Sequence, residues 1–261
     1  MAGFPVLSFE QTAVFLLIFL RVGAILVMIP VFGDRTVPNR VKATLGLVVA
    51  LLLYPLIQFE LPPAYQDNLI VMIAGMAGEL FVGILIGFTA RCIFAAIQSA
   101  GEMAGIQIGF SMANIIDPLS SMQVSIIAEF LYLLGMLVFL VVDAHHIFLA
   151  SLVESYQRIP PLEFNFSGPL VQLLTTMTGN LFLIAIKLSA PVVAVVLLIN
   201  IGLAVIARTV PQINVFIIGF PLQIAVGLFF LGAMAPIFVK MAGRLFLQLQ
   251  DELTMLFKLM Q

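Results

Sequence analysis

The stretch LSAPVVAVVLLINIGLAVIA, residues 188–207, contains no charged residue and decides which kind of fold this chain can adopt. A helix that crosses the hydrocarbon core of a bilayer needs about 20 apolar residues, because each residue advances about 1.5 Å and the core is about 30 Å thick. Two more runs without a formal charge, 164–186 and 209–239, flank this stretch. The C-terminal part of the chain is therefore expected to form membrane-spanning helices.

The composition of the whole chain agrees with this expectation. Its 261 residues are 62% hydrophobic and 9% charged, with a mean hydropathy of +1.21. Soluble domains carry roughly 25% charged residues, so an ordinary soluble fold is excluded, and so is disorder. A net charge of −2 excludes electrostatic capture of nucleic acid. A single cysteine, Cys92, excludes an internal disulfide and a cysteine-based zinc site. An integral membrane protein, or a subunit buried in a membrane assembly, remains.

The apolar pattern predicts an all-α membrane protein of about six long, broken helices. Prolines and polar breaks separate the blocks, and Pro30, for example, ends the first one. The linker 155–168 divides four helices from a final helical hairpin. We expect the helices at about 12–29, 41–53, 69–108, 125–154, from 170 to 207, and from 215 to 249 with an amphipathic tail.

Six charged residues lie inside or near the ends of these apolar blocks. A charge at the centre of a bilayer costs about 2.5–3.5 kcal/mol, so each needs a partner. Arg91 and Glu102 point the same way on one helix but stand about 16 Å apart, too far for an ion pair. The partners are then other helices of this chain, other subunits, or a proton or ion relay. The six are Arg21, Glu79, Arg91, Glu102, Glu129 and Lys187.

Glycines recur every four residues in the third block, a spacing that lets another backbone come close. The groove that they form fits either a helix of the same chain or a neighbouring subunit. These glycines are Gly83, Gly87, Gly101, Gly105 and Gly109.

The chain breaks after Gly109 into an apolar loop that ends in Asp117-Pro118. Irregular backbone at membrane depth is tolerated where protein buries it or where it lines a cavity. Such a loop is either an ordinary interfacial connection or a hydrophobic constriction that excludes water from a narrow path. The side chains available for a constriction are Phe110, Met112, Ile115 and Ile116.

Candidate catalytic residues are few, and we expect no enzyme, no cofactor and no metal. His145 and His146 are adjacent, so on a helix they should diverge by about 100° and fail to chelate one ion together. Asp143 and His146 are spaced for a local hydrogen bond or a wet helix end.

Three stretches resemble the FliR family of type III export gate proteins. The first is Arg21-Val22 with PVFGDRTVPNRVK, residues 30–42. The second and most distinctive is GEMAGIQIGFS, residues 101–111, closing in Asp117-Pro118. The third is PQINVFIIGFPL, residues 211–222. The second stretch is closer to the flagellar branch of the family than to the virulence-injectisome branch.

This resemblance implies a hetero-oligomeric helical channel in the bacterial inner membrane, within the flagellar basal body and raised toward the periplasm. The partners would be FliP, FliQ and FlhB, with FlhA nearby, and unfolded flagellar proteins would pass through the channel. Residues 1–165 would be FliP-like and residues 166–261 a FliQ-like hairpin. The segment 109–122 would plug the closed channel. The plug residues would be Phe110, Ser111, Met112, Ile115, Ile116, Asp117 and Pro118.

The sequence leaves alternatives open for the orientation of the chain in the membrane and for its class of function. The basic loops hold Arg35, Arg40, Lys42 and Arg208, which the positive-inside rule places in the cytoplasm. Lys240, Arg244 and Lys258 fall on the opposite side of that count. A stand-alone secondary transporter is the second interpretation, although no inverted repeat is visible. The virulence counterpart of the same gate is a further alternative, and an intramembrane enzyme that depends on Asp143, His145 or His146 is the third interpretation.

Overall fold

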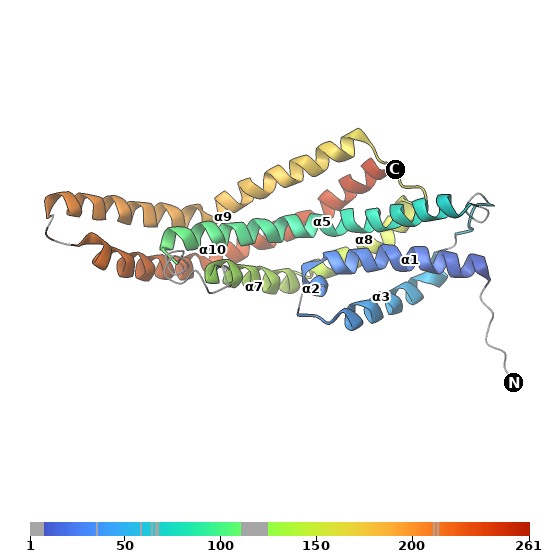
Figure 1. Ribbon diagram of the computed structural model, residues 1–261, viewed down its shortest axis with the longest axis horizontal. Helices are drawn as coiled ribbons and strands as arrows, with labels where there is room; N and C mark the ends of the chain where they lie inside the picture. Colours follow the sequence, from blue (N-terminus) through green and yellow to red (C-terminus); the bar gives the residue numbers. More distant parts are fainter. Residues whose placement is uncertain are drawn as a thin grey trace. The chain divides into compact units, whose positions relative to one another are not determined.

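The computed structural model describes residues 8–34, 36–57, 59–63, 65, 68–110, 125–210, 212 and 214–261. The described residues form helices and connecting turns, with no strand among them, so the predicted all-α class is confirmed. The helices are α1 (Phe9–Met28), α2 (Pro30–Gly33), α3 (Asn39–Leu53), the short 3-10 helix η1 (Tyr54–Leu56), α5 (Leu69–Ile108), α7 (Ile126–Val141), α8 (Ala144–Arg158), α9 (Gly168–Thr209) and α10 (Val215–Met260) (Figure 1).

Among the described residues, five helices are long and apolar enough to cross a membrane. The number is six if α7 and α8 together make one broken span. The prediction of about six apolar helices is therefore confirmed, and the chain is a helical membrane protein.

Local chemistry explains where α1 begins and ends. The Ser8 hydroxyl accepts a hydrogen bond from the Gln11 backbone N–H at 3.2 Å, while the Gln11 side chain accepts one from the Ser8 N–H at 3.0 Å. This reciprocal capping box satisfies two backbone donors that no helical carbonyl reaches. At the other end, Pro30 restricts Ile29 to an extended conformation, so the helix stops at Met28.

The fourth predicted block is a broken span, which agrees with the expectation of broken helices, but the position of its break was not predicted. It is divided into α7 and α8 at Val142 and Asp143. Asp143 adopts a left-handed conformation with φ of 55°, which cannot continue a right-handed helix. The sixth block also extends further than expected, since α10 continues to Met260. Its last turns keep the expected amphipathic pattern: Leu249, Leu253, Leu256, Phe257 and Met260 are buried.

Two compact units can be described separately. The first comprises Met1–Arg91, Asp143–Thr176 and Gln248–Gln261. In it, α1 provides the fully buried Ile18 and Val22, and the C-terminal end of α10 is tied to the start of α9. The tie is the Ser167 hydroxyl, which donates to the Leu259 carbonyl at 2.8 Å.

The second unit comprises Cys92–Val142 and Met177–Leu247. Phe94, Phe139 and Phe246 make mutual ring contacts there, with centroids 5.2 to 5.6 Å apart. The predicted division at residue 165 concerns likeness to two other proteins rather than compactness, and it stays a prediction.

Candidate functional site

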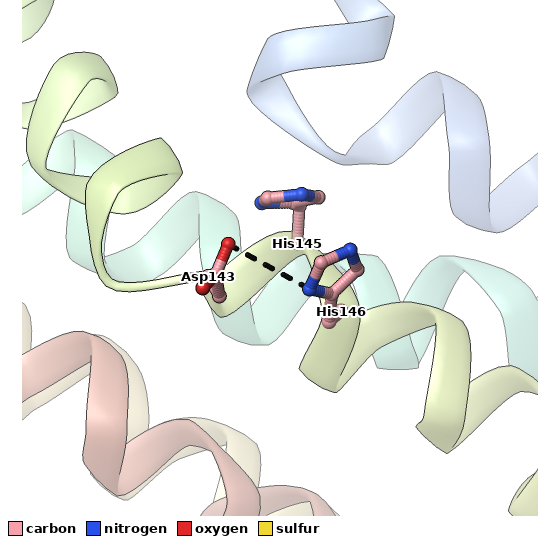
Figure 2. A group of neighbouring side chains, drawn as sticks. All are labelled: Asp143, His145 and His146. Atoms are coloured by element: carbon pink, nitrogen blue, oxygen red, sulfur yellow. Dashed lines mark ion pairs between the residues drawn. The ribbon is translucent and has the colours of Figure 1, made fainter.

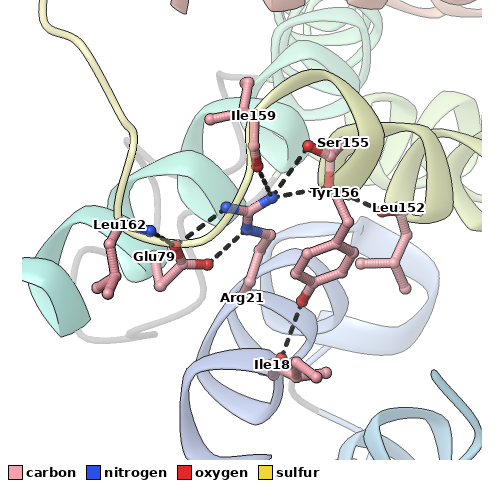
Figure 3. A network of polar contacts seen from close by, with 8 residues as sticks. All are labelled: Ile18, Arg21, Glu79, Leu152, Ser155, Tyr156, Ile159 and Leu162. Atoms are coloured by element: carbon pink, nitrogen blue, oxygen red, sulfur yellow. Dashed lines mark hydrogen bonds and ion pairs between the residues drawn. The ribbon is translucent and has the colours of Figure 1, made fainter. Parts of the chain in front are cut away.

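Arg21 and Glu79 form a buried ion pair between α1 and α5 (Figure 3). Nε of Arg21 donates to Oε2 of Glu79 at 2.6 Å, and Nη2 donates to Oε1 at 3.0 Å. The two side chains are 0% and 1% exposed, so neither charge reaches solvent. Of the alternatives that the sequence left open, pairing between helices of the same chain holds for these two residues.

The remaining donors of Arg21 are directed at α8 and the turn after it. Nη1 donates to the Ile159 carbonyl at 2.9 Å and to the Ser155 carbonyl at 3.1 Å. The Tyr156 ring lies below the guanidinium, 4.3 Å from Cζ, and its hydroxyl donates to the Ile18 carbonyl at 3.2 Å. Glu79 also accepts from the Leu162 N–H at 3.0 Å. The pair thus fixes three segments of the first unit at one point.

Sequence reasoning identified the two charges of this network but missed Ser155, Tyr156 and Ile159. Two of the contacts are backbone carbonyls, which no residue type reveals. Tyr156 and Ser155 lie near the end of α8, a position that the sequence does not distinguish from an ordinary amphipathic turn.

The other four charges have a different environment, because they are exposed on the single chain. Arg91 donates from Nε to the Met28 carbonyl at 3.2 Å and so satisfies the C-terminal end of α1. Within the described ranges, Glu102, Glu129 and Lys187 make no hydrogen bond or ion pair.

The glycines of α5 are contacted by helices of the same chain. A Cβ on Gly83 would lie 2.6 Å from Ala24 Cβ, and one on Gly87 would lie 2.1 Å from Met28 Cβ. In the second unit, a Cβ on Gly101 would lie 2.4 Å from the Ala128 Cα. Likewise, a Cβ on Gly105 would lie 2.4 Å from Ser125 Oγ.

The α5 glycine groove is therefore filled by α1 and by the start of α7. The sequence left open whether a helix of the same chain or a neighbouring subunit fills this groove, and helices of the same chain fill it.

The C-terminal end of α5 rests on a packed apolar cluster in the second unit. Gly109 has φ of +101°, a left-handed conformation that glycine adopts without strain and that ends the helix. A Cβ at this position would lie 3.6 Å from the Phe220 ring of α10. The cluster below it consists of Ala104, Ile108, Ile127, Val192 and Val196, with Phe110, Ile224 and Leu231 packed against it.

One polar pair lies on the hairpin next to this cluster. The Gln223 side-chain amide donates to the Asn200 side-chain oxygen and so links α10 to α9. Four helices therefore meet where the polypeptide leaves α5.

Some predicted site residues fall outside the described residues. These are Ser111, Met112, Ile115, Ile116, Asp117 and Pro118 of the expected plug, and Arg35 of the basic loop. Of the other basic loop residues, Arg40 and Arg208 are exposed. Lys42 donates from Nζ to the Gly33 carbonyl at 3.0 Å, which ties α3 to the turn before it.

Asp143, His145 and His146 lie closer together than their spacing predicted (Figure 2). The two imidazole centroids are 4.1 Å apart, and Nδ1 of His146 is 3.6 Å from Oδ1 of Asp143. The expectation that the histidines diverge is therefore wrong. The expected local contact between Asp143 and His146 at an exposed helix start is present.

These features define the chain as an all-helical integral membrane protein. Some of the charged residues on its apolar helices are paired within the chain, and the others are exposed. It belongs to the family described as bacterial export proteins, family 1, whose profile matches residues 12–249. The residues that the sequence singled out, from Arg21 to the turn before α10, fall within that match.

The chain is similar to several proteins named flagellar biosynthetic protein FliR. The one from Bacillus subtilis (strain 168) is 38% identical over 215 residues, which cover 81% of this chain and 82% of the relative. The one from Escherichia coli (strain K12) is 31% identical over 232 residues, covering 87% and 86%. The one from Pectobacterium carotovorum is 30% identical over 236 residues, covering 89% and 88%. Family and apolar helices together support a membrane-embedded component of flagellar protein export.

Proposed function

We propose that this chain is a subunit of the core export gate of the flagellar type III secretion system. With FliP and FliQ, it forms and closes the channel through which unfolded flagellar proteins cross the inner membrane. The chain acts as a structural channel component rather than as an enzyme.

The length of α5 carries this proposal. Its 40 residues contain no proline and extend about 60 Å along the helix axis, at about 1.5 Å per residue. The hydrocarbon core is about 30 Å thick, and spanning helices tilt by about 20° on average. A large part of α5 therefore lies outside the hydrocarbon.

Apolar side chains are nevertheless exposed near both ends of α5. Ile70 is 78% exposed and Ile106 is 62% exposed on the single chain. Lipid tails cannot cover both ends of so long a helix, and exposed apolar surface in water is unfavourable. Other polypeptides must cover the rest, as a hetero-oligomeric channel raised above the membrane plane would.

The exposed charges support the same assembly. Glu102, Glu129 and Lys187 have no partner in the described part of the chain, although they lie on apolar helices. Because an isolated charge in an apolar setting is costly, charged groups on neighbouring subunits are the partners that we propose. FliP and FliQ would supply them, with FlhB alongside and FlhA nearby.

The end of α5 supports a role in closure. Phe110 packs against a cluster to which α5, α7, α9 and α10 all contribute, and Gly109 starts the turn there. A rigid apolar base of this kind can hold the segment 109–122 across a narrow path and keep water out. In this proposal residues 1–165 are the FliP-like part, and residues 166–261 are the FliQ-like hairpin.

Co-purification tests the proposal against the transporter alternative. The chain is tagged and extracted with mild detergent from a flagellated bacterium. A gate subunit is recovered with FliP- and FliQ-like chains and restores flagella in a FliR-deletion strain. A transporter would be recovered alone or as a homo-oligomer that moves a small solute unaided, and this result would overturn the proposal. Complementation of an injectisome mutant instead would indicate the virulence branch.

A further inference from the structure

We infer that Asp143, His145 and His146 form a binding site for one divalent transition-metal ion of the zinc class. The three residues belong to the first compact unit, at the break that precedes α8. Nothing in the proposed channel function requires this cluster, so the inference stands independently of it.

The ligand atoms are spread somewhat more widely than in a zinc site. The three candidate ligand atoms all lie within 4.8 Å of one another. Zinc bonds to imidazole nitrogen and carboxylate oxygen are about 2.0–2.2 Å long and zinc sites are tetrahedral, so two ligand atoms of one ion are about 3.4 Å apart. Asp143 Oδ1 and His146 Nδ1, at 3.6 Å, are already close to that separation. The other separations, which are up to 4.8 Å, would have to shorten by side-chain rotation when the ion binds.

The adjacent histidines can cooperate here because the orientations of their side chains bring the two rings together at the start of α8. His145 and His146 are in the first turn of α8, and their rings are tilted by 42° with centroids 4.1 Å apart. The left-handed Asp143, with φ of 55°, precedes them and makes no capping hydrogen bond with its side chain. The carboxylate is therefore not engaged with the backbone of the first turn, and it is directed toward the imidazole of His146 (Figure 2).

The ligand set selects the chemical class of the ion. Two imidazoles and one carboxylate suit Zn²⁺, Ni²⁺ and Cu²⁺, whereas Ca²⁺ and Mg²⁺ prefer oxygen ligands alone. The Asp143 and His146 side chains are 69% and 66% exposed, so water can occupy the fourth position. A bound ion would fix Asp143 in its left-handed turn and hold the start of α8 in place.

The test is metal titration of the full-length chain without a polyhistidine tag, in detergent and after treatment with EDTA. Isothermal titration calorimetry with Zn²⁺ should give one site per chain, and Mg²⁺ should give no heat of binding. Zn²⁺ should also raise the thermal unfolding midpoint, because a ligand that binds the folded state stabilises it.

Three variants make the test specific. His146→Gln and Asp143→Asn should each weaken Zn²⁺ binding at least about tenfold, because loss of even an outer-shell partner of a metal ligand costs about 10- to 100-fold in affinity. Asn tolerates the left-handed conformation, so Asp143→Asn keeps the turn. Glu154→Gln, on the same helix and outside the cluster, should bind Zn²⁺ like the natural chain. Absence of Zn²⁺ binding, equal binding by all variants, or equal affinity for Mg²⁺ would overturn the inference.

Discussion

The guanidinium of Arg21 and the carboxylate of Glu79 form a bidentate ion pair, although the two residues are 58 positions apart in the sequence. They join α1 to α5, and Arg21 also holds the end of α8 through the Ser155 and Ile159 carbonyls. If either partner is lost, the other charge stays buried and uncompensated. Helix arrangements that separate the two residues are therefore unfavourable, and the pair fixes one arrangement of the helices.

Glu79→Leu should therefore destabilise the chain strongly. Removing one partner of a buried pair costs about 3–5 kcal/mol. The thermal unfolding midpoint in detergent should fall accordingly, and the double variant Arg21→Met with Glu79→Leu should recover part of the loss. Glu154→Gln is the control, because the partly exposed Glu154–Arg158 pair contributes about 1 kcal/mol at most. Equal midpoints for Glu79→Leu and Glu154→Gln would contradict the role assigned to the buried pair.

Gly101→Ala should force α5 and α7 apart. The added Cβ would lie 2.4 Å from the Ala128 Cα, which is backbone and cannot rotate away. Overpacking of this kind costs about 1–3 kcal/mol. Gly179→Ala is the matched control, because no heavy atom lies within 4 Å of its Cβ position in α9.

Alanine at position 179 should even stabilise the helix, by up to about 1 kcal/mol. Thermal unfolding of the two variants should thus move in opposite directions. A Gly101→Ala variant that unfolds like the natural chain would show that the crossing is looser than described.

Ile108→Ala should weaken the apolar base of the α5 end. Ile108 is 0% exposed within its cluster, and a buried isoleucine truncated to alanine costs about 2–5 kcal/mol. Ile106→Ala, two residues earlier and 62% exposed, should leave the unfolding midpoint of the isolated chain nearly unchanged. Similar unfolding midpoints for the two variants would show that the cluster around Ile108 does not stabilise the C-terminal end of α5.

Phe110→Gly should make the assembled gate leak small ions. The lost ring no longer packs on the cluster, so water can enter the closed path. Deletion of residues 111–121 should have the same effect. Ion leak is measured by the membrane-potential response of cells in which the assembly is verified by co-purification. Phe166→Gly, which removes an exposed ring between α8 and α9, is the control and should remain tight. An unchanged leak with verified assembly would contradict the closing role.

Replacing Glu102 and Glu129 together by glutamine should reduce recovery of partner subunits without lowering the stability of the chain itself. Both carboxylates are exposed, so their loss removes no internal contact among the described residues. Quantitative pull-down measures the recovery of partner subunits, and the thermal unfolding midpoint measures the stability of the chain, so the two measurements together separate assembly from folding. A fall in the midpoint with unchanged recovery would assign these charges to folding instead of assembly.

The helices themselves could largely be predicted, because apolar length and proline positions act locally. The third block was expected at about 69–108, and α5 occupies Leu69–Ile108. The break at Asp143 could not be predicted, since a left-handed aspartate in an apolar run has no local signature comparable to that of glycine or proline. The closeness of the His145 and His146 rings depends on side-chain orientation, which spacing along a helix does not determine.

By itself, the sequence determined that this chain is a helical membrane protein with charges that need partners. The length of each apolar run and the charges within it can be read from the sequence, and these two features decide whether a helix can span the bilayer and what its charges cost there. The tertiary structure decided which charges are paired inside the chain and which face outward. It placed Glu79 against Arg21 and left Glu102 exposed, although both are glutamates on the same helix. Only the packing of distant segments distinguishes the two, since a partner 58 residues away is not encoded in the neighbourhood of either.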